Sequence, residues 1–265
     1  MSYPSFNILE ELKKLFKLIS ELDKKIIIIF ISVAILQTIS WYYTSRRFFR
    51  FNLFDLLHYS EKVYLIEYFY WYLSDFITLF ILPLLIIKFL LKEKISDYGL
   101  KAGDYKAGLS ITLIFVVVMA FFIWLMSASK SFGYYYPPLN LLKTSWGLFY
   151  LYLAGLFIYM IAWEFIWRGF MLFGLEEKFG YYSILIQMIP FLILHNGKPA
   201  VETFGAIIAG LALGILAFRT RSIFYCVITH FCVMFSINFI SILRFRAGDY
   251  GVGFGSLFHI LGKIF

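Results

Sequence analysis

AGLSITLIFVVVMAFFIWLM, residues 107–126, is a run of twenty residues without a charged side chain. At about 1.5 Å of rise per residue, a helix of this length crosses roughly 30 Å, the thickness of the hydrocarbon core of a bilayer. Uncharged runs also occupy residues 26–43 and 146–163, and residues 222–243 contain only His230 as an ionisable group. The sequence therefore predicts transmembrane helices.

The composition excludes several other classes of protein. Of the 265 residues, 62% are hydrophobic and only 15% are charged. A soluble domain is about 25% charged, so too few polar residues remain to cover a surface in water. This excludes a soluble enzyme, a disordered protein and a nucleic-acid-binding module. We expect the lipid bilayer to be a partner, and nucleic acid not to be one.

The predicted fold class is all-α: a polytopic transmembrane helix bundle of about seven spans, with limits of six and eight. Weaker apolar runs at 72–91, 181–194 and 203–218 supply the remaining spans. The aromatic segment 48–71 is predicted to be an interfacial or re-entrant helix.

The chain divides into four parts by this pattern. Residues 1–25 combine apolar residues at helical spacing with charged ones on the other faces, which predicts an amphipathic interfacial helix. Residues 26–145 hold the amino-terminal membrane helices, 146–243 the core with the candidate site, and 244–265 a carboxyl-terminal tail.

The distribution of Lys and Arg predicts the orientation. With the amino terminus in the cytoplasm, thirteen of the 24 Lys and Arg lie on the inner side and ten on the outer side, leaving Arg168 within the membrane. The positive-inside rule then favours a cytoplasmic amino terminus in a multi-pass protein of the cell membrane.

Ionisable residues inside predicted spans are the candidates for chemistry, since a charge at the bilayer centre costs roughly 2.5–3.5 kcal/mol on insertion scales. Glu164 and Arg168 lie four residues apart, so they share a helix face. The pair is either a structural ion pair or part of a functional site.

His195 and His230 belong to two further apolar segments. Glu164 and His195 lie at similar distances from a turn near Gly180, which predicts similar depths in an antiparallel hairpin. Glu202 returns to about the level of His195, whereas His230 is predicted to be roughly 8 Å shallower than Glu164. Each histidine is otherwise explained as an interfacial or packing side chain.

These residues form recognisable motifs. ExxxRGF begins at Glu164, FxxxH ends at His195, and His230 follows a Gly-rich helix and an Arg-Thr-Arg-Ser turn at 219–222. Together with Asp-Tyr-Gly-Leu at 97–100, the pattern over about 146–243 resembles the CPBP family. These are the CAAX-processing and bacteriocin-processing intramembrane proteases, also called Abi or type II CAAX endopeptidases.

The resemblance implies a bundle of membrane helices and a set of site residues. Glu164, His195 and His230 are implied as catalytic. Supporting roles are assigned to four further residues: Arg168, Glu202, Asn196 and Asn238. The sequence departs from the family pattern at Trp163, where the family has a leading glutamate, and at Met234, where it has an Asn or acidic residue.

The leading hypothesis is an intramembrane endopeptidase that cleaves membrane-associated, in some cases prenylated, proteins or peptides. Glu164 would activate water as a general base, His195 would orient that water, and His230 would stabilise the oxyanion. No cofactor is required. Zinc bound by the same three residues is the metal-dependent version.

Two other hypotheses remain open. Trp163 and Met234 favour a non-catalytic membrane protein of the same fold, acting as an immunity or scaffold factor. An ion or proton carrier could use the same residues as a relay, although no internal repeat supports a transporter.

Overall fold

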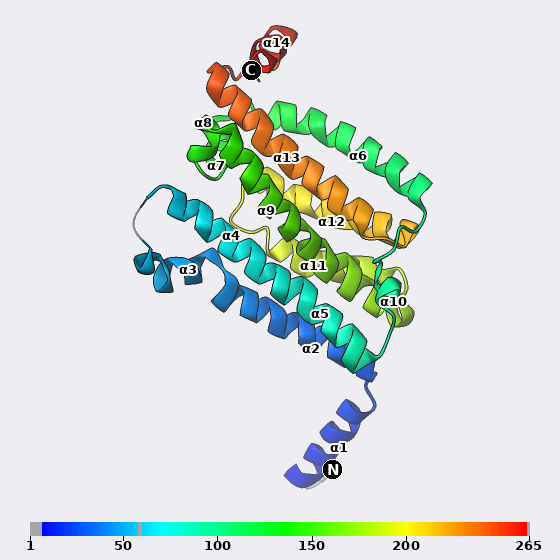
Figure 1. Cartoon of the computed structure of the whole chain (residues 1–265). Helices are drawn as coiled ribbons and strands as arrows, with labels where there is room; N and C mark the ends of the chain where they lie inside the picture. Colours follow the sequence, from blue (N-terminus) through cyan, green and yellow to red (C-terminus); the bar gives the residue numbers. More distant parts are fainter. Residues whose placement is uncertain (1–6, 58–59, 264–265) are drawn as a thin grey trace, which may run out of the picture.

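The computed structural model describes residues 7–57 and 60–263, and this part of the chain contains helices and no strand (Figure 1). Residues 1–6, the start of the predicted amphipathic segment, lie outside it. The amino-terminal helices, several of which run into each other as one continuous helix, are α1 (Ile8–Ser20), α2 (Lys24–Ile39), η1 (Ser40–Thr44), α3 (Arg46–Asn52), η2 (Phe54–Leu56), α4 (Lys62–Phe76), η3 (Ile77–Ile81), α5 (Leu82–Leu85), η4 (Ile86–Leu91) and η5 (Ile95–Tyr98).

The second half of the chain is also helical. Its elements are α6 (Tyr105–Met126), α7 (Lys130–Tyr135), α8 (Leu141–Thr144), α9 (Trp146–Glu164), η6 (Phe165–Phe173), α10 (Gly174–Phe179), α11 (Tyr182–Ile193), α12 (Ala200–Thr220), α13 (Phe224–Ala247) and α14 (Phe254–Leu261). The short helix α14 lies in the predicted tail.

Six helices are long and apolar enough to cross a membrane. They are Lys24–Asn52, Lys62–Leu91, Tyr105–Met126, Trp146–Phe179, Ala200–Thr220 and Phe224–Ala247. Within the described residues, α11 is a shorter apolar helix of 12 residues that also belongs to the bundle. The predicted all-α, polytopic fold of about seven spans is confirmed.

Residues with short polar side chains precede several of these helices and cap their amino-terminal ends. Asp23 accepts hydrogen bonds from the backbone N–H groups of Lys25 and Ile26 at the start of α2, and Asp104 accepts one from Ala107 in α6. Ser145 does the same for Leu148 in α9. Such caps satisfy donors that have no partner within the helix, so each polar residue before an apolar run sets the start of a span.

Two predicted boundaries were wrong. The segment 48–71 is not one interfacial helix: its first residues continue the first span into α3, and residues 62–71 begin the second span. The aromatic residues there misled the prediction, because Tyr68 and Tyr72 are buried against α9 rather than placed at a membrane surface. The amphipathic helix α1 ends at Ser20, and Lys24 and Lys25 belong to α2.

The span Trp146–Phe179, made of α9, η6 and α10, is the most buried and runs through the middle of the bundle (Figure 1). α9 packs between α4 and α13, while α11 packs against both α12 and η6. The span Tyr105–Met126 is the least buried and contacts mainly α13. Any chemistry on the central span is therefore shielded from lipid by its neighbours.

Candidate active site

Glu164 ends α9, and its side chain is fully buried. The next nine residues, η6, form a π-helix, a wider turn that often occurs at functional sites. Arg168 lies within this π-helix and is also fully buried. Two opposite charges buried at the centre of a membrane bundle stabilise each other only when they are close.

The two charges do form a pair. Arg168 Nη1 lies 3.1 Å from the Glu164 carboxylate and donates a hydrogen bond to Oε1. The shared helix face predicted from their spacing is confirmed by this contact. The same Oε1 also lies 2.6 Å from Nδ1 of His230, which comes from α13. Glu164 is thus held by one residue of its own span and one of a distant span.

His195 follows the end of α11 and is buried. Its Nδ1 lies 2.7 Å from the carbonyl oxygen of Phe191, so Nδ1 carries the hydrogen and donates it. Thr203 Oγ1 donates to the backbone carbonyl of His195 at 3.0 Å and fixes the loop on the other side. Because Nδ1 is engaged, Nε2 is the nitrogen that can meet a substrate or water.

The ring of Phe191 lies among the charged residues of the site. Its centroid is 4.5 Å from that of His195 and 6.3 Å from that of His230, and the Arg168 guanidinium lies 4.2 Å from it. Contacts of this type favour a cation over the face of a ring. Phe191 therefore brings side chains of the central span, α11 and α13 into one cluster.

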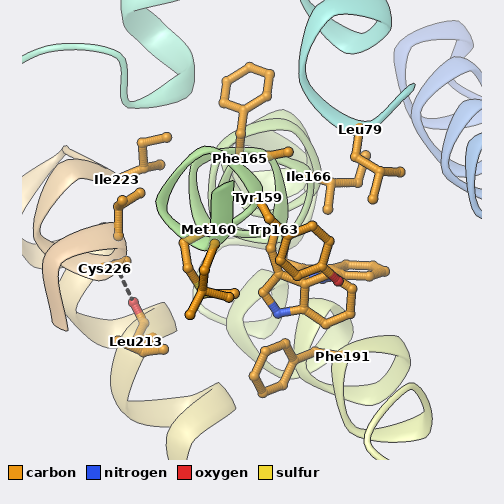
Figure 2. Close-up of a cluster of buried hydrophobic side chains, with 14 of the residues drawn as sticks. Leu79, Tyr159, Met160, Trp163, Phe165, Ile166, Phe191, Leu213, Ile223 and Cys226 are labelled. Carbon is orange, nitrogen blue, oxygen red and sulfur yellow. Dashed lines mark hydrogen bonds between the residues drawn. The ribbon is translucent and has the colours of Figure 1, made fainter. Parts of the chain in front are cut away.

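Trp163 lies on the same cluster, at the position where the family has its leading glutamate. Its ring centroid is 6.0 Å from Phe191 and 6.2 Å from His195, and it stacks on Tyr159 at 5.7 Å. Figure 2 shows Trp163 and Phe191 facing each other from two helices. An aromatic wall stands where a second carboxylate is expected.

Burial sets the protonation state of His195. The pKa of this imidazole falls from its ordinary value of 6.5 to about 4, because burial disfavours the charged form, with a smaller effect from the positive charge of Lys198. His195 is therefore neutral at pH 7, and Nε2 carries a lone pair.

The structure does not bring the other predicted supporting residues into direct contact with this cluster. Asn196 is exposed, and Asn238 donates its amide hydrogen to the carbonyl of Met234 one turn before it. Glu202 accepts hydrogen bonds from the hydroxyl of Tyr136 and from Lys198. Glu202 is thus held by Tyr136 and Lys198 next to the loop that contains His195.

Two positioning contacts were missed from the sequence. Thr203 holds the His195 carbonyl, and Tyr136 holds Glu202 from a segment 66 residues away. Nothing in the local pattern of the sequence signals either one, since an ordinary Thr and Tyr become informative only when the fold brings them to the site.

The arrangement does not fit the zinc alternative. No group of three or more His, Cys, Asp or Glu residues suited to hold a metal ion occurs in the part of the chain that the structure describes. His230 Nδ1 and Glu164 Oε1 bond to each other, and His195 Nδ1 bonds to a backbone carbonyl. We therefore derive no catalytic step through a metal.

Fold and site together define a polytopic helical membrane protein with a buried glutamate, arginine and two histidines gathered from separate helices. Residues 144–236 match the family model of the type II CAAX prenyl endopeptidase Rce1-like proteins. This match covers all four residues and confirms the resemblance of this region to the CAAX protease family. Comparison with curated proteins and with solved structures finds no match.

Proposed function

We propose that this protein is an intramembrane endopeptidase that hydrolyses peptide bonds of membrane-associated, including prenylated, proteins or peptides. The observation that carries the proposal is the 2.6 Å hydrogen bond between His230 Nδ1 and Glu164 Oε1 in the core of the bundle. The family match of the same region supports the reaction class. A carboxylate bound to an imidazole in a water-poor site is an arrangement suited to moving a proton.

Proton transfer is assigned to Glu164 and His230 as a pair. The carboxylate accepts the Nδ1 hydrogen, which leaves a lone pair on Nε2 of the neutral imidazole. The pair can take a proton from water through Nε2 while Glu164 stabilises the imidazolium, as the buried carboxylate does in serine hydrolases. This assignment differs from the sequence hypothesis, in which Glu164 alone was the base and His230 stabilised the oxyanion.

The water oxygen then attacks the scissile carbonyl carbon. Its proton passes to the pair, and negative charge develops on the carbonyl oxygen. Arg168 is the fixed cation beside the pair, and its Nε and Nη2 make no hydrogen bond with the residues the structure describes. We assign these N–H groups to the oxyanion. When the C–N bond breaks, the pair returns its proton to the leaving amine.

His195 orients the water. Its neutral Nε2 accepts a hydrogen bond, while Phe191 and Thr203 fix the ring and the backbone of this residue. Such preorganisation raises the rate because the reacting atoms already lie in the geometry for attack.

The test is cleavage of a prenylated membrane-bound peptide by the purified full chain, followed by mass spectrometry. Glu164→Gln and His230→Gln are each expected to lower kcat by about 10²–10⁴, the usual contribution of general acid–base catalysis. Glu177→Gln is the matched control, because Glu177 is exposed at the end of the same span. Cleavage by Glu164→Gln at the wild-type rate would contradict the mechanism, and inhibition by a chelator that zinc reverses would assign a metal.

The second candidate is a non-catalytic member of the family, favoured by Trp163. This bulky ring takes the position of the leading glutamate and packs on Phe191 and His195. If so, the purified wild type cleaves no peptide, and Glu164→Gln and His195→Ala leave the biological effect of the protein intact. Detectable cleavage that Glu164→Gln abolishes rejects this candidate.

A further inference from the structure

Asp75 is a second buried carboxyl group, and the proposed reaction does not use it. It lies near the middle of the span Lys62–Leu91, is 1% exposed, and faces the first span. Within the described residues, no Lys, Arg or His lies within ion-pair distance of it. A lone charge at this depth would be unfavourable, since the side chain is buried away from bulk solvent and no cationic side chain pairs with it.

The surroundings of Asp75 consist of neutral hydrogen-bonding groups. Ser40 Oγ lies 2.8 Å from Oδ1, Thr44 Oγ1 also contacts Oδ1, and Trp71 Nε1 lies 2.7 Å from Oδ2. Thr44 Oγ1 makes one more hydrogen bond, at 3.2 Å, to the carbonyl oxygen of Ser40. Four hydrogen bonds therefore connect the carboxyl, the two hydroxyls, the indole and this carbonyl.

Four such contacts need four hydrogens, one between each pair of heavy atoms. Ser40 and Thr44 each supply one hydroxyl hydrogen, and the Trp71 indole supplies one. If Thr44 donates to the Ser40 carbonyl, the contact between Thr44 and Asp75 needs a hydrogen that only the carboxyl can provide. We propose that Asp75 is a proton-binding site between η1 and α4 and holds one proton as a neutral carboxylic acid at neutral pH.

The remaining titratable groups near Asp75 fit this assignment. Among the described residues, Tyr70 on the same helix and Tyr159 on α9 are ionisable side chains that interact with Asp75 electrostatically. Both are neutral phenols at pH 7. Glu67, two turns earlier on α4, is occupied by Arg46 and Arg50, so these arginines do not compensate a charge on Asp75.

The proton has a structural role between the first two spans and the candidate site. Asp75 orients Trp71, whose ring packs on Tyr159 at a centroid distance of 4.7 Å. Tyr159 stacks in turn on Trp163, which faces His195. A neutral Asp75 thus keeps η1 packed on α4 and supports the aromatic residues beside the site.

Infrared difference spectroscopy tests the proposal directly, because a neutral carboxyl and a carboxylate absorb at different frequencies. The spectrum of the wild-type full chain in lipid nanodiscs at pH 7 minus that of Asp75→Asn is expected to contain the carbonyl band of a carboxylic acid, shifted in D₂O. Asp97→Asn is the matched control: Asp97 is exposed, so its difference spectrum contains carboxylate bands. Carboxylate bands in the Asp75 difference spectrum would overturn the proposal.

Thermal unfolding provides a second measurement. Asn reproduces the neutral acid, with one donor and one acceptor side, so Asp75→Asn is expected to unfold within a few degrees of the wild type at pH 7. Raising the pH ionises Asp75 and is expected to lower the wild-type Tm more than that of the Asn variant. Stabilisation by Na⁺ but not K⁺ that disappears in Asp75→Asn would assign a metal cation instead and overturn the proposal.

Discussion

At the scale of single residues, the buried imidazole of His195 predicts a loss of stability in acid. Its pKa in the folded protein, about 4, lies below the ordinary value of 6.5 that applies to the unfolded chain. Between these values the unfolded state binds more protons, so the stabilisation is complete above pH 6.5 and is lost as pH falls through 4. The full difference is on the order of 3 kcal/mol.

The measurement is Tm against pH for the wild type and His195→Gln in the same nanodiscs. The pKa values of Asp104 and Asp249 are lowered by hydrogen bonds from backbone N–H groups, so their contribution to the stability of the protein is also lost in acid. This loss occurs equally in the wild type and in the variant. The wild type is therefore expected to lose more Tm than the variant between pH 6.5 and 4. Parallel curves would show that His195 is not held neutral by burial.

Substitution of Trp163 is expected to lower the stability of the protein through a loss of packing. Its indole is 9% exposed and contacts Tyr159, Trp167 and Phe191. Trp163→Ala is expected to lower the free energy of unfolding by about 3–5 kcal/mol, through lost contacts and the cavity that remains. Trp163→Phe is expected to lose less than half of this amount in chemical unfolding. Equal losses in both variants would show that ring packing does not explain the residue.

At the scale of elements, η6 depends on Gly169. A Cβ there would lie 2.4 Å from the ring of Phe165 and 3.1 Å from the Tyr98 carbonyl oxygen, which is backbone and cannot move freely. Gly169→Ala is expected to destabilise the protein by about 1–3 kcal/mol and to reduce cleavage, because it displaces the helix that carries Arg168.

Gly205 in α12 offers the matched control. Nothing lies within 4 Å of a Cβ at that position, so Gly205→Ala is expected to be neutral or to stabilise the helix by about 0.5–1 kcal/mol. Both free energies come from chemical unfolding in one detergent. A Gly169→Ala protein as stable as Gly205→Ala would mean that the close packing around η6 is not required.

The same elements show which features the sequence predicts. The contact between Glu164 and Arg168 is local, so their spacing was sufficient to predict it. The position of His230 depends on how α13 crosses the central span, and the predicted depth was too shallow. The depth of Glu164 was counted from Gly180, but Arg221, at the turn before α13, pairs with Glu176, which is four residues closer to Glu164.

Helical periodicity could not predict the π-helix of η6 or the packing of Phe191 between Arg168 and the histidines. A π-helix arises where tertiary contacts outweigh the α-helical hydrogen-bond pattern, and no residue type specifies it. Asn238 illustrates another limit of the sequence. It was assigned a supporting role, but its amide bonds to Met234 within its own helix.

At the scale of the whole molecule, charged pairs connect the helix ends on one side of the bundle. They join the start of α2, the loops on both sides of η5, helix α10 and the end of α12. The pairs are Lys25 with Glu93 and Glu177, Arg219 with Asp104, and Arg221 with Glu176. The opposite side is held by Arg244, which donates to Ser127 and to the backbone carbonyls of Asp249 and Gly251 in the α13–α14 loop. The two ends of the bundle are thus distinct in sequence and in contacts.

This asymmetry makes the predicted cytoplasmic amino terminus testable. Lys101 lies on the side of the charged pairs and Asn140 on the opposite side, and both are exposed. With a membrane-impermeant maleimide applied to intact cells, Asn140→Cys is expected to react, and Lys101→Cys only after permeabilisation. The wild type is the control, because Cys226 and Cys232 both lie within the membrane-spanning helix α13. The reverse labelling pattern would place the amino terminus outside and show that the small surplus of Lys and Arg does not set the orientation.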